Sequence, residues 1–231
     1  MDKKISVLLS VFNEEKNIAA SIESICNQTY ENFEFLIIDD CSTDNSYEII
    51  NEFSNRDDRI KIIRNSSNIG LTKSLNKLIK DSSGDYLARQ DADDISLLNR
   101  FEKQVEFLNN LDYQACTTRA IIREETRITP NKSFYIPKFL IMNLKNPFVH
   151  GSLMIRKKTI ESIGFYDEAF YYAQDYKLMS DLISSGYKIK IIKEPLYILN
   201  VKDNISTNFY EKQKYYADCV KKKIKPEIFA T

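Results

Sequence analysis

The chain contains few glycines. Its 231 residues include five, at positions 70, 84, 151, 164 and 186, and their spacing forms neither a G-x-G-x-x-G pattern nor a Walker loop. Loops of those two kinds use glycine so that backbone N–H groups can surround phosphate groups. A phosphate ligand of this protein would therefore have to be neutralised by other means, of which a metal ion is the simplest.

Histidine and cysteine are also scarce. His150 is the single histidine, which excludes a metal site built from several histidines. The four cysteines lie far apart without the paired spacing of a zinc site, and we expect a reduced, intracellular setting. The N-terminus leads directly into a predicted strand without a signal-peptide pattern, so we expect a cytoplasmic protein.

The chain also has no excess of positive or negative charge and no long apolar run. The 33 basic residues balance the 33 acidic ones, so no overall field favours nucleic acid as a partner. No apolar run reaches the roughly 20 residues needed to cross a bilayer. The length fits one sizeable α/β domain, with or without an appended segment.

The first half alternates apolar runs with helical periodicity. Strands are predicted at 5–11, 33–38, 60–63 and 86–90, and amphipathic helices follow each of them. Helices are expected to open at Asn13 and after the cap-like 42–44 segment, and to cover about 97–108. This order indicates a mostly parallel, right-handed β-α-β sheet flanked by helices.

The second half contains all five prolines and a less regular pattern. Strands are predicted at 114–122, 149–155, 187–192 and 195–199, and helices at 157–163 and 175–183. We expect a single domain over 1–208, in which 1–110 binds a ligand and 111–208 completes the pocket. Residues 209–231 are expected to form a basic C-terminal helix or tail.

Three carboxylates follow the predicted strand 86–90. Asp91, Asp93 and Asp94 lie within four residues, and open α/β sheets bind ligands at the carboxyl ends of their strands. Like charges this close need compensation, and a divalent cation with oxygen ligands would provide it. A solvated, Asp-rich surface turn is the simpler alternative.

Five segments together resemble the family 2 glycosyltransferases of the inverting GT-A type, and in particular the bacterial members that build surface polysaccharides. The segments match the family's opening strand, its D-D-x-S-T-D, N-x-G and D-x-D motifs, and a later strand. They are Ser6–Glu14, Asp39–Asp44, Asn68–Gly70 with Asn76, Gly84–Arg100 and His150–Arg156. The resemblance covers about residues 4 to 200 and implies a Rossmann-like GT-A fold.

The resemblance implies a donor site for a UDP-sugar. Asp93 would bind Mn²⁺ or Mg²⁺, because hard carboxylate ligands suit these ions, and Asp91 would contact the ribose. Asp40 would accept a hydrogen bond from the uracil N3–H, which cytosine lacks. The remaining donor-binding positions that the motifs imply are Ser10, Asn13, Glu14, Gly70 and Ala92.

The resemblance also implies a base for the acceptor, which would be a hydroxyl of a glycan or of a lipid-linked oligosaccharide. An alcohol is a poor nucleophile until its proton leaves, and Asp175 occupies the motif position of that base. A plain acid at a helix N-terminus is the alternative for Asp175. One base with in-line attack would invert the anomeric centre and turn an α-linked donor into a β-linkage.

Several residues have structural alternatives. Asp39 is expected to orient the following turn, and Asp94 either caps a helix or belongs to the site. Arg100 pairs with a carboxylate or binds a phosphate. His150 on its strand is packed or contacts the acceptor rather than binding metal.

The chain departs from the family at three places. Gln174 replaces the usual acid before Asp175, and Cys41 stands where glycine is frequent. Asn200 ends the segment Tyr197–Asn200, where the family often shows Tyr-Arg-x-His and its histidine helps to hold the metal.

The C-terminal segment combines lysines with aromatic residues. A solvated basic helix is one interpretation, and peripheral contact with the inner, anionic face of the cell membrane is the other, since basic residues near lipid contribute about 1 kcal/mol each. Two other functions stay open: a sugar-nucleotide-binding protein without catalysis, and another metal-carboxylate enzyme such as a nucleotidyltransferase or phosphohydrolase.

Overall fold

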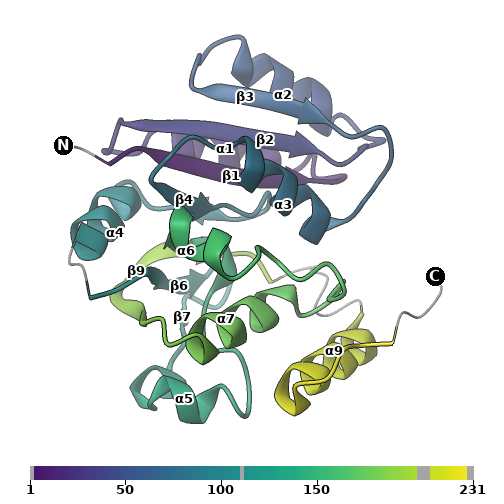
Figure 1. Cartoon of the computed structure of the whole chain (residues 1–231). Coiled ribbons are helices and arrows are strands. Elements are labelled where there is room, and N and C mark those ends of the chain that lie inside the picture. Colours follow the sequence, from purple (N-terminus) through teal and green to yellow (C-terminus); the bar gives the residue numbers. More distant parts are fainter. Residues whose placement is uncertain (1–2, 110–111, 202–208, 228–231) are drawn as a thin grey trace.

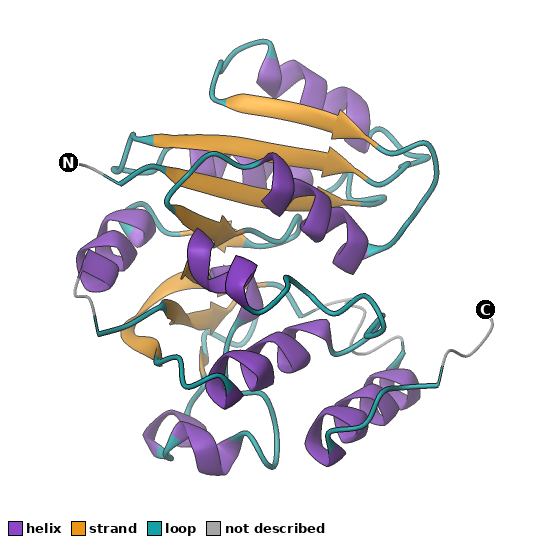
Figure 2. Cartoon of the chain, in the orientation of Figure 1, coloured by secondary structure: helices purple, strands orange, loops and turns teal. Residues whose placement is uncertain are grey.

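The computed structural model describes residues 3–109, 112–201 and 209–227. These residues form one mixed sheet of nine strands in the order β3-β2-β1-β4-β8-β6-β9-β5, with β7 paired to β6 (Figure 1). Helices cover both faces of this sheet (Figure 2). The α/β architecture predicted from the sequence is therefore present.

The first half is the regular, parallel part. Strands β1, β2, β3 and β4 pair in parallel, so their carboxyl ends lie at one edge of the sheet. The strands of this half are β1 (Ile5–Val11), β2 (Phe33–Asp39), β3 (Ile60–Arg64) and β4 (Tyr86–Arg89). The helices are α1 (Ile18–Cys26), α2 (Ser46–Ser54), α3 (Leu71–Asp81) and α4 (Arg100–Asn109).

The second half extends the sheet with mixed pairing. β8 runs antiparallel to both β4 and β6, whereas β6 and β9 are parallel and β5 is antiparallel to β9. Its strands are β5 (Ile95–Ser96), β6 (Ala115–Ile122), β7 (Ile128–Thr129), β8 (Met154–Arg156) and β9 (Ile189–Leu199). Its helices are η1 (Lys132–Tyr135), α5 (Lys138–Ile141), η2 (His150–Ser152), α6 (Lys157–Ser162), α7 (Gln174–Ser184) and α9 (Tyr210–Lys222).

Four sequence predictions of local structure are wrong. The strand predicted at 149–155 is the 3₁₀ turn η2 followed by the short strand β8. The two strands predicted at 187–192 and 195–199 are the single strand β9, whose pairing with β6 shifts register around Arg119. α1 begins at Ile18 rather than near Asn13, and α2 begins at Ser46 after a turn.

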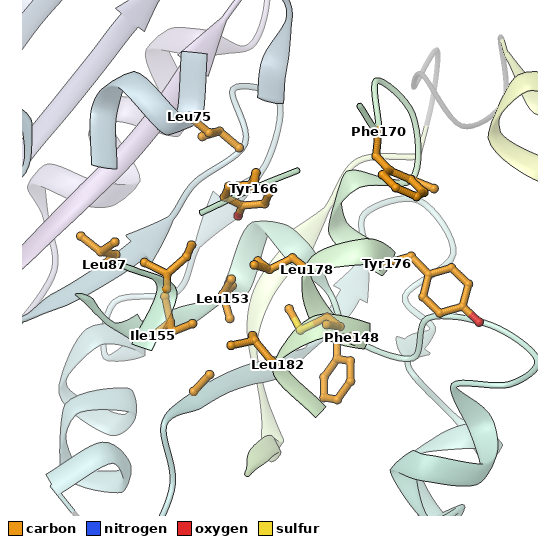
Figure 3. Close-up of a cluster of buried hydrophobic side chains, with 14 of the residues drawn as sticks. Leu75, Leu87, Phe148, Leu153, Ile155, Tyr166, Phe170, Tyr176, Leu178 and Leu182 are labelled. Atoms are coloured by element: carbon orange, nitrogen blue, oxygen red, sulfur yellow. The ribbon is translucent and has the colours of Figure 1, made fainter. Parts of the chain in front are cut away.

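The alternation of side chains along the strands divides the hydrophobic core between the two faces of the sheet. In β1, Leu8 joins one cluster, whereas Val7 and Leu9 join the other. The first cluster packs under α3, α6 and α7 and includes Leu75, Leu87, Leu153 and Leu178 (Figure 3). This packing fixes β4 and the N-terminus of α7, the two elements that carry the predicted donor and acceptor residues.

The C-terminal helix α9 is part of the same packed body. Its Tyr216, Cys219 and Val220 are buried and belong to the cluster that contains α7. Gln213 also accepts a hydrogen bond from the Ala173 N–H at 3.1 Å, directly before α7. Among the described residues, no helix combines the length and the apolar character that spanning a bilayer requires.

Candidate active site

The acidic turn 91–94 follows β4 at the edge where the parallel strands end. Gln90, which is completely buried, holds this turn in place: its Nε2 donates to the backbone oxygens of Asp91 at 3.2 Å and Asp94 at 2.9 Å. Ser21 of α1 donates to the Asp91 oxygen at 2.8 Å. The turn is therefore fixed by buried hydrogen bonds, which is not expected of a solvated surface turn.

Arg100 supports this turn from below. Its guanidinium is completely buried and donates to Gln90 Oε1 at 3.1 Å, Ser96 Oγ at 2.6 Å and the Arg89 carbonyl at 2.7 Å. Among the described residues, Arg100 forms no ion pair with a carboxylate, and its complete burial keeps it from a phosphate, so its role here is structural. Burial lowers its pKa from 12.5 to about 10, which leaves it charged at neutral pH.

Asp91 is held by three different parts of the chain. One carboxylate oxygen accepts from the Arg89 guanidinium, and the Asp91 N–H donates to the buried Tyr197 hydroxyl at 3.2 Å. A Cβ atom placed on Gly151 would lie 2.5 Å from Asp91 Oδ2 and 2.3 Å from the Tyr197 hydroxyl. Glycine at 151 thus allows η2 to approach the acidic turn closely.

We expect Gly151→Ala to displace Asp91 and Tyr197. Overpacking of a tightly packed site costs about 1–3 kcal/mol, and the clash is with the buried Tyr197 hydroxyl and the hydrogen-bonded, partly exposed Asp91 carboxylate. The melting temperature should fall, and nucleotide affinity should fall with it. Gly186→Ala serves as the control for the change of residue type, because a Cβ there meets nothing within 4 Å although φ is +82°. Equal nucleotide affinity in both variants would contradict the predicted role of Gly151.

The ionised forms of Asp93 and Asp94 are disfavoured by burial and by neighbouring negative charges. Burial, followed by the charges of Asp91 and Glu14, raises the pKa of Asp93 from 3.8 to about 6. Burial and the charges of Asp91 and Asp93 also raise the pKa of Asp94 well above its usual value. The helix-cap interpretation of Asp94 is wrong, because Asp94 leads into β5 and accepts a hydrogen bond from the Asn200 N–H at 2.7 Å.

The residues present fit a divalent cation that is shared with a ligand. Among the described residues, no group of three or more His, Cys, Asp or Glu could enclose an ion. Mg²⁺ and related ions are instead commonly held by one or two carboxylates together with substrate phosphates. Asp93 is partly exposed and destabilised by neighbouring negative charge, so it suits such an ion when a diphosphate supplies the other oxygens.

The loops that follow β1 and β2 are bound to each other. Asn13 Oδ1 accepts from the Thr43 N–H at 2.8 Å, and the Glu14 N–H donates to Ser46 Oγ at 2.8 Å. Ser10, partly exposed near the end of β1, pairs in register with Ile38 of β2. The predicted donor-site residues Ser10, Asn13 and Glu14 therefore lie at the strand edge that also carries the acidic turn.

The D-D-x-S-T-D segment has a clear structural role. Asp39 Oδ1 accepts from the Ser42 N–H at 3.2 Å, which agrees with the turn-orienting role expected of it. Its other oxygen lies 3.1 Å from Arg64 Nε without the alignment of a hydrogen bond. Cys41 has φ +66°, a conformation that favours glycine, which agrees with the glycine that the family resemblance leads us to expect at this position.

Asp40 organises the loop before α3. Its carboxylate accepts from Asn65 Nδ2 at 2.8 Å, the Ile69 N–H at 2.9 Å and the Gly70 N–H at 2.8 Å. The sequence did not indicate this role, and the predicted uracil contact remains a prediction that would use the remaining acceptor capacity of Oδ2. Gly70 has φ +87°, and the exposed ring of Tyr171 covers it.

The other side of the site is the N-terminus of α7. Gln174 and Asp175 are its first two residues and are partly exposed. Asp175 Oδ2 accepts from Asn146 Nδ2 at 2.7 Å, which orients the carboxylate and leaves the other oxygen available. Ala92, in contrast, packs its side chain into the core, so it can offer a ligand its backbone only.

His150 lies in η2, near enough to Asp91 and Asp175 for both of their charges to act on it. Its Nε2 is 2.7 Å from the hydroxyl of the buried Tyr166. Burial and the Arg89 charge lower the pKa of His150 to about 4, against the opposing charges of Asp91 and Asp175. His150 is therefore neutral near pH 7, and it is within electrostatic range of both predicted ends of the site.

Sequence reasoning missed the residues that support the acids. Arg89, Tyr197 and Tyr166 are buried, and none of them was predicted as a site residue, although Arg89 and Tyr197 lie in segments compared with family motifs. Arg89 carried the clearest indication, since a cation at the end of an apolar strand directly before several carboxylates is unusual. β9 brings Tyr197 to the turn, and the segment before α7 brings Tyr166 to His150; local sequence patterns predict neither contact.

Comparisons with known proteins agree with the motifs. The family model of Glycosyl transferase family 2 matches residues 6–166. The Bacillus subtilis glycosyltransferase EpsE is 36% identical over 203 residues, which cover 84% of this chain and 72% of EpsE. The Escherichia coli UDP-Glc:alpha-D-GlcNAc-diphosphoundecaprenol beta-1,3-glucosyltransferase WfgD is 29% identical over 224 residues, which cover 86% of each protein.

A similar solved structure confirms the fold. The mannosyltransferase PcManGT from Pyrobaculum calidifontis, in complex with GDP-Man and Mn²⁺, superposes with a TM-score of 0.75 at 15% identity. The match covers 94% of this chain and 62% of that protein. The predicted glycosyltransferase resemblance and the GT-A fold class are both confirmed.

Proposed function

The chain belongs to glycosyl transferase family 2, and from this premise we propose that it moves a hexose from a UDP-sugar to a hydroxyl of a glycan or lipid-linked acceptor in surface-polysaccharide synthesis. The proposed reaction inverts the anomeric centre and uses Mn²⁺ or Mg²⁺. The names of two similar proteins support the donor class and the ion: WfgD uses UDP-Glc, and PcManGT carries Mn²⁺.

One structural observation supports a single catalytic site. Asp91, in the acidic turn, and Asp175, at the start of α7, both lie near enough to the buried His150 for their charges to act on its pKa, so the two carboxylates flank one residue. A donor held at the turn would present its anomeric carbon toward α7. An acceptor hydroxyl beside Asp175 would then attack from the face opposite the leaving diphosphate.

The chain's own residues have separable tasks in this proposal. Asp175 accepts the proton of the acceptor hydroxyl, and Asn146 keeps its carboxylate in position. Asp91 and the loops after β1 and β2 hold the nucleoside. Asp93 would hold the metal, which when bound stabilises the negative charge that develops on the departing diphosphate.

The alternatives differ in measurable ways. A phosphohydrolase with two bridged metals would need more ligands than the described residues bring together. A panel of UDP-sugars with Mn²⁺ should identify a donor that binds only with metal and is slowly hydrolysed without an acceptor. Metal-dependent UDP binding without hydrolysis or transfer of any sugar would favour the non-catalytic alternative, and no UDP binding would overturn the proposal.

A further inference from the structure

A cluster of exposed apolar side chains lies on η1, α5 and the turn after them. We call residues 132–145 the η1–α5 surface. Four large apolar side chains are exposed here: Tyr135 by 72%, Ile136 by 39%, Leu140 by 49% and Leu144 by 71%. Figure 1 shows α5 at the end of the molecule farthest from β3. Exposed apolar residues gathered in one short segment usually mark an interaction surface.

The charged side chains within this segment have one sign. No Asp or Glu occurs from position 126 to position 160, whereas lysines stand at 132, 138 and 145. Within the described residues, the exposed Lys132, Lys145 and Lys190 form no ion pair. Burial and, after it, the charge of the nearby Lys190 in β9 lower the pKa of Lys138, so Lys190 borders this surface.

The η1–α5 surface is attached directly to the predicted base. The Tyr176 hydroxyl in α7 donates to the Met142 carbonyl at the end of α5. Asn146, immediately after this surface, donates to Asp175 at 2.7 Å. A partner that occupies the surface therefore lies beside the acceptor end of the site.

We propose that the η1–α5 surface docks on an anionic lipid bilayer, with its apolar side chains inserted at the headgroup level and its lysines at the phosphates. Apolar side chains interleaved with basic ones favour this partner, because burial of the first and attraction of the second act together. The inference rests on the proposed function, since docking here would bring a lipid-linked acceptor to Asp175.

The C-terminal segment suits this role less well. In α9, Tyr216, Cys219 and Val220 pack against the domain, and Lys221 pairs with Asp218 at 3.0 Å. The C-terminal segment nevertheless has at least as many exposed lysines as the η1–α5 surface, so substitutions there provide a matched control. Removing α9 would expose the core residues beneath it, and substitutions test the segment more cleanly than truncation does.

The test is flotation of the full chain with vesicles of phosphatidylcholine alone or mixed with phosphatidylglycerol. We expect binding to the mixed vesicles and none to the neutral ones. The K132Q/K145Q/K190Q variant should bind about 100-fold less tightly, since each lysine near the lipid contributes roughly fivefold. The L140S/L144S variant should also lose binding. The control variant K214Q/K222Q/K225Q should bind like the parent chain.

Three results would overturn the inference. They are no binding of the parent chain to anionic vesicles, equal binding of the parent and the η1–α5 variants, and loss of binding in the C-terminal control alone. If L140S/L144S instead changes a dimer into a monomer in sedimentation and leaves vesicle binding intact, the occupant is a second copy. Hydrolysis of a UDP-sugar without vesicles tests the proposed function separately, and the η1–α5 variants should retain it.

Discussion

Asp175→Asn is expected to lower the rate of sugar transfer by about 10²–10⁴-fold, the usual contribution of a positioned general base. The amide oxygen of asparagine can still accept the hydrogen bond from Asn146, so the local structure should persist. Asp175 lies on α7, apart from the acidic turn, and donor affinity should therefore stay unchanged. Single-turnover transfer and calorimetric titration with the UDP-sugar measure the two quantities.

The same helix offers a control for the loss of one negative charge. Asp181 lies two turns farther along α7, where it accepts from Lys177 Nζ at 2.6 Å. Asp181→Asn should transfer sugar like the parent protein. Normal turnover of the Asp175→Asn variant would remove Asp175 from the mechanism. Equal losses in both variants would indicate a general effect of charge on α7.

The sequence was sufficient for the parallel half because local patterns determine it. Each strand from β1 to β4 is an apolar run, and each following helix has one apolar face, so periodicity alone located them. The positions of Asp40 and Asp91 follow, since motif residues directly after parallel strands must share one edge. The helix start at Ile18 was missed because the N–H groups of Asn13 and Glu15 donate to the side chains of Ser42 and Asp44 in the loop after β2.

The second half depends on contacts between distant parts of the chain. β9 is one strand across Pro195 because the register shift in its pairing with β6 accommodates the proline there. Asp94 accepts a hydrogen bond from the N–H of Asn200, which follows β9, and no sequence pattern near Asp94 indicates this contact. Arg100 can be buried because five acceptors converge on it, from Arg89, Gln90, Ser96, Gln104 and Gly151. The donor motifs could thus be predicted from the sequence, whereas the buried residues that support them could be identified only from the tertiary structure.

Asp93→Asn is expected to have opposite effects on function and on stability. Metal-dependent affinity for UDP should be lost, because the amide carries no charge to bind the cation. Without metal, the folded protein should become more stable at pH 7.5. The pKa of Asp93 rises from 3.8 to about 6 on folding, a shift that corresponds to at most about 3 kcal/mol and, with partial solvent screening, to roughly 1–2 kcal/mol.

The pH dependence of this gain follows from the sign of the shift. Since the folded protein binds the Asp93 proton more tightly than the unfolded chain does, the destabilisation is complete above pH 6 and disappears as the pH falls toward 4. Denaturant unfolding with EDTA should therefore show D93N more stable than the parent at pH 7.5 and equal to it near pH 4. Asp58 is exposed, and D58N provides a charge-matched control. D58N should change neither the metal-dependent affinity for UDP nor the free energy of unfolding. If D93N kept Mn²⁺-dependent UDP binding, the cation would be held elsewhere; if it gained no stability, the acidic turn would already be compensated within the protein.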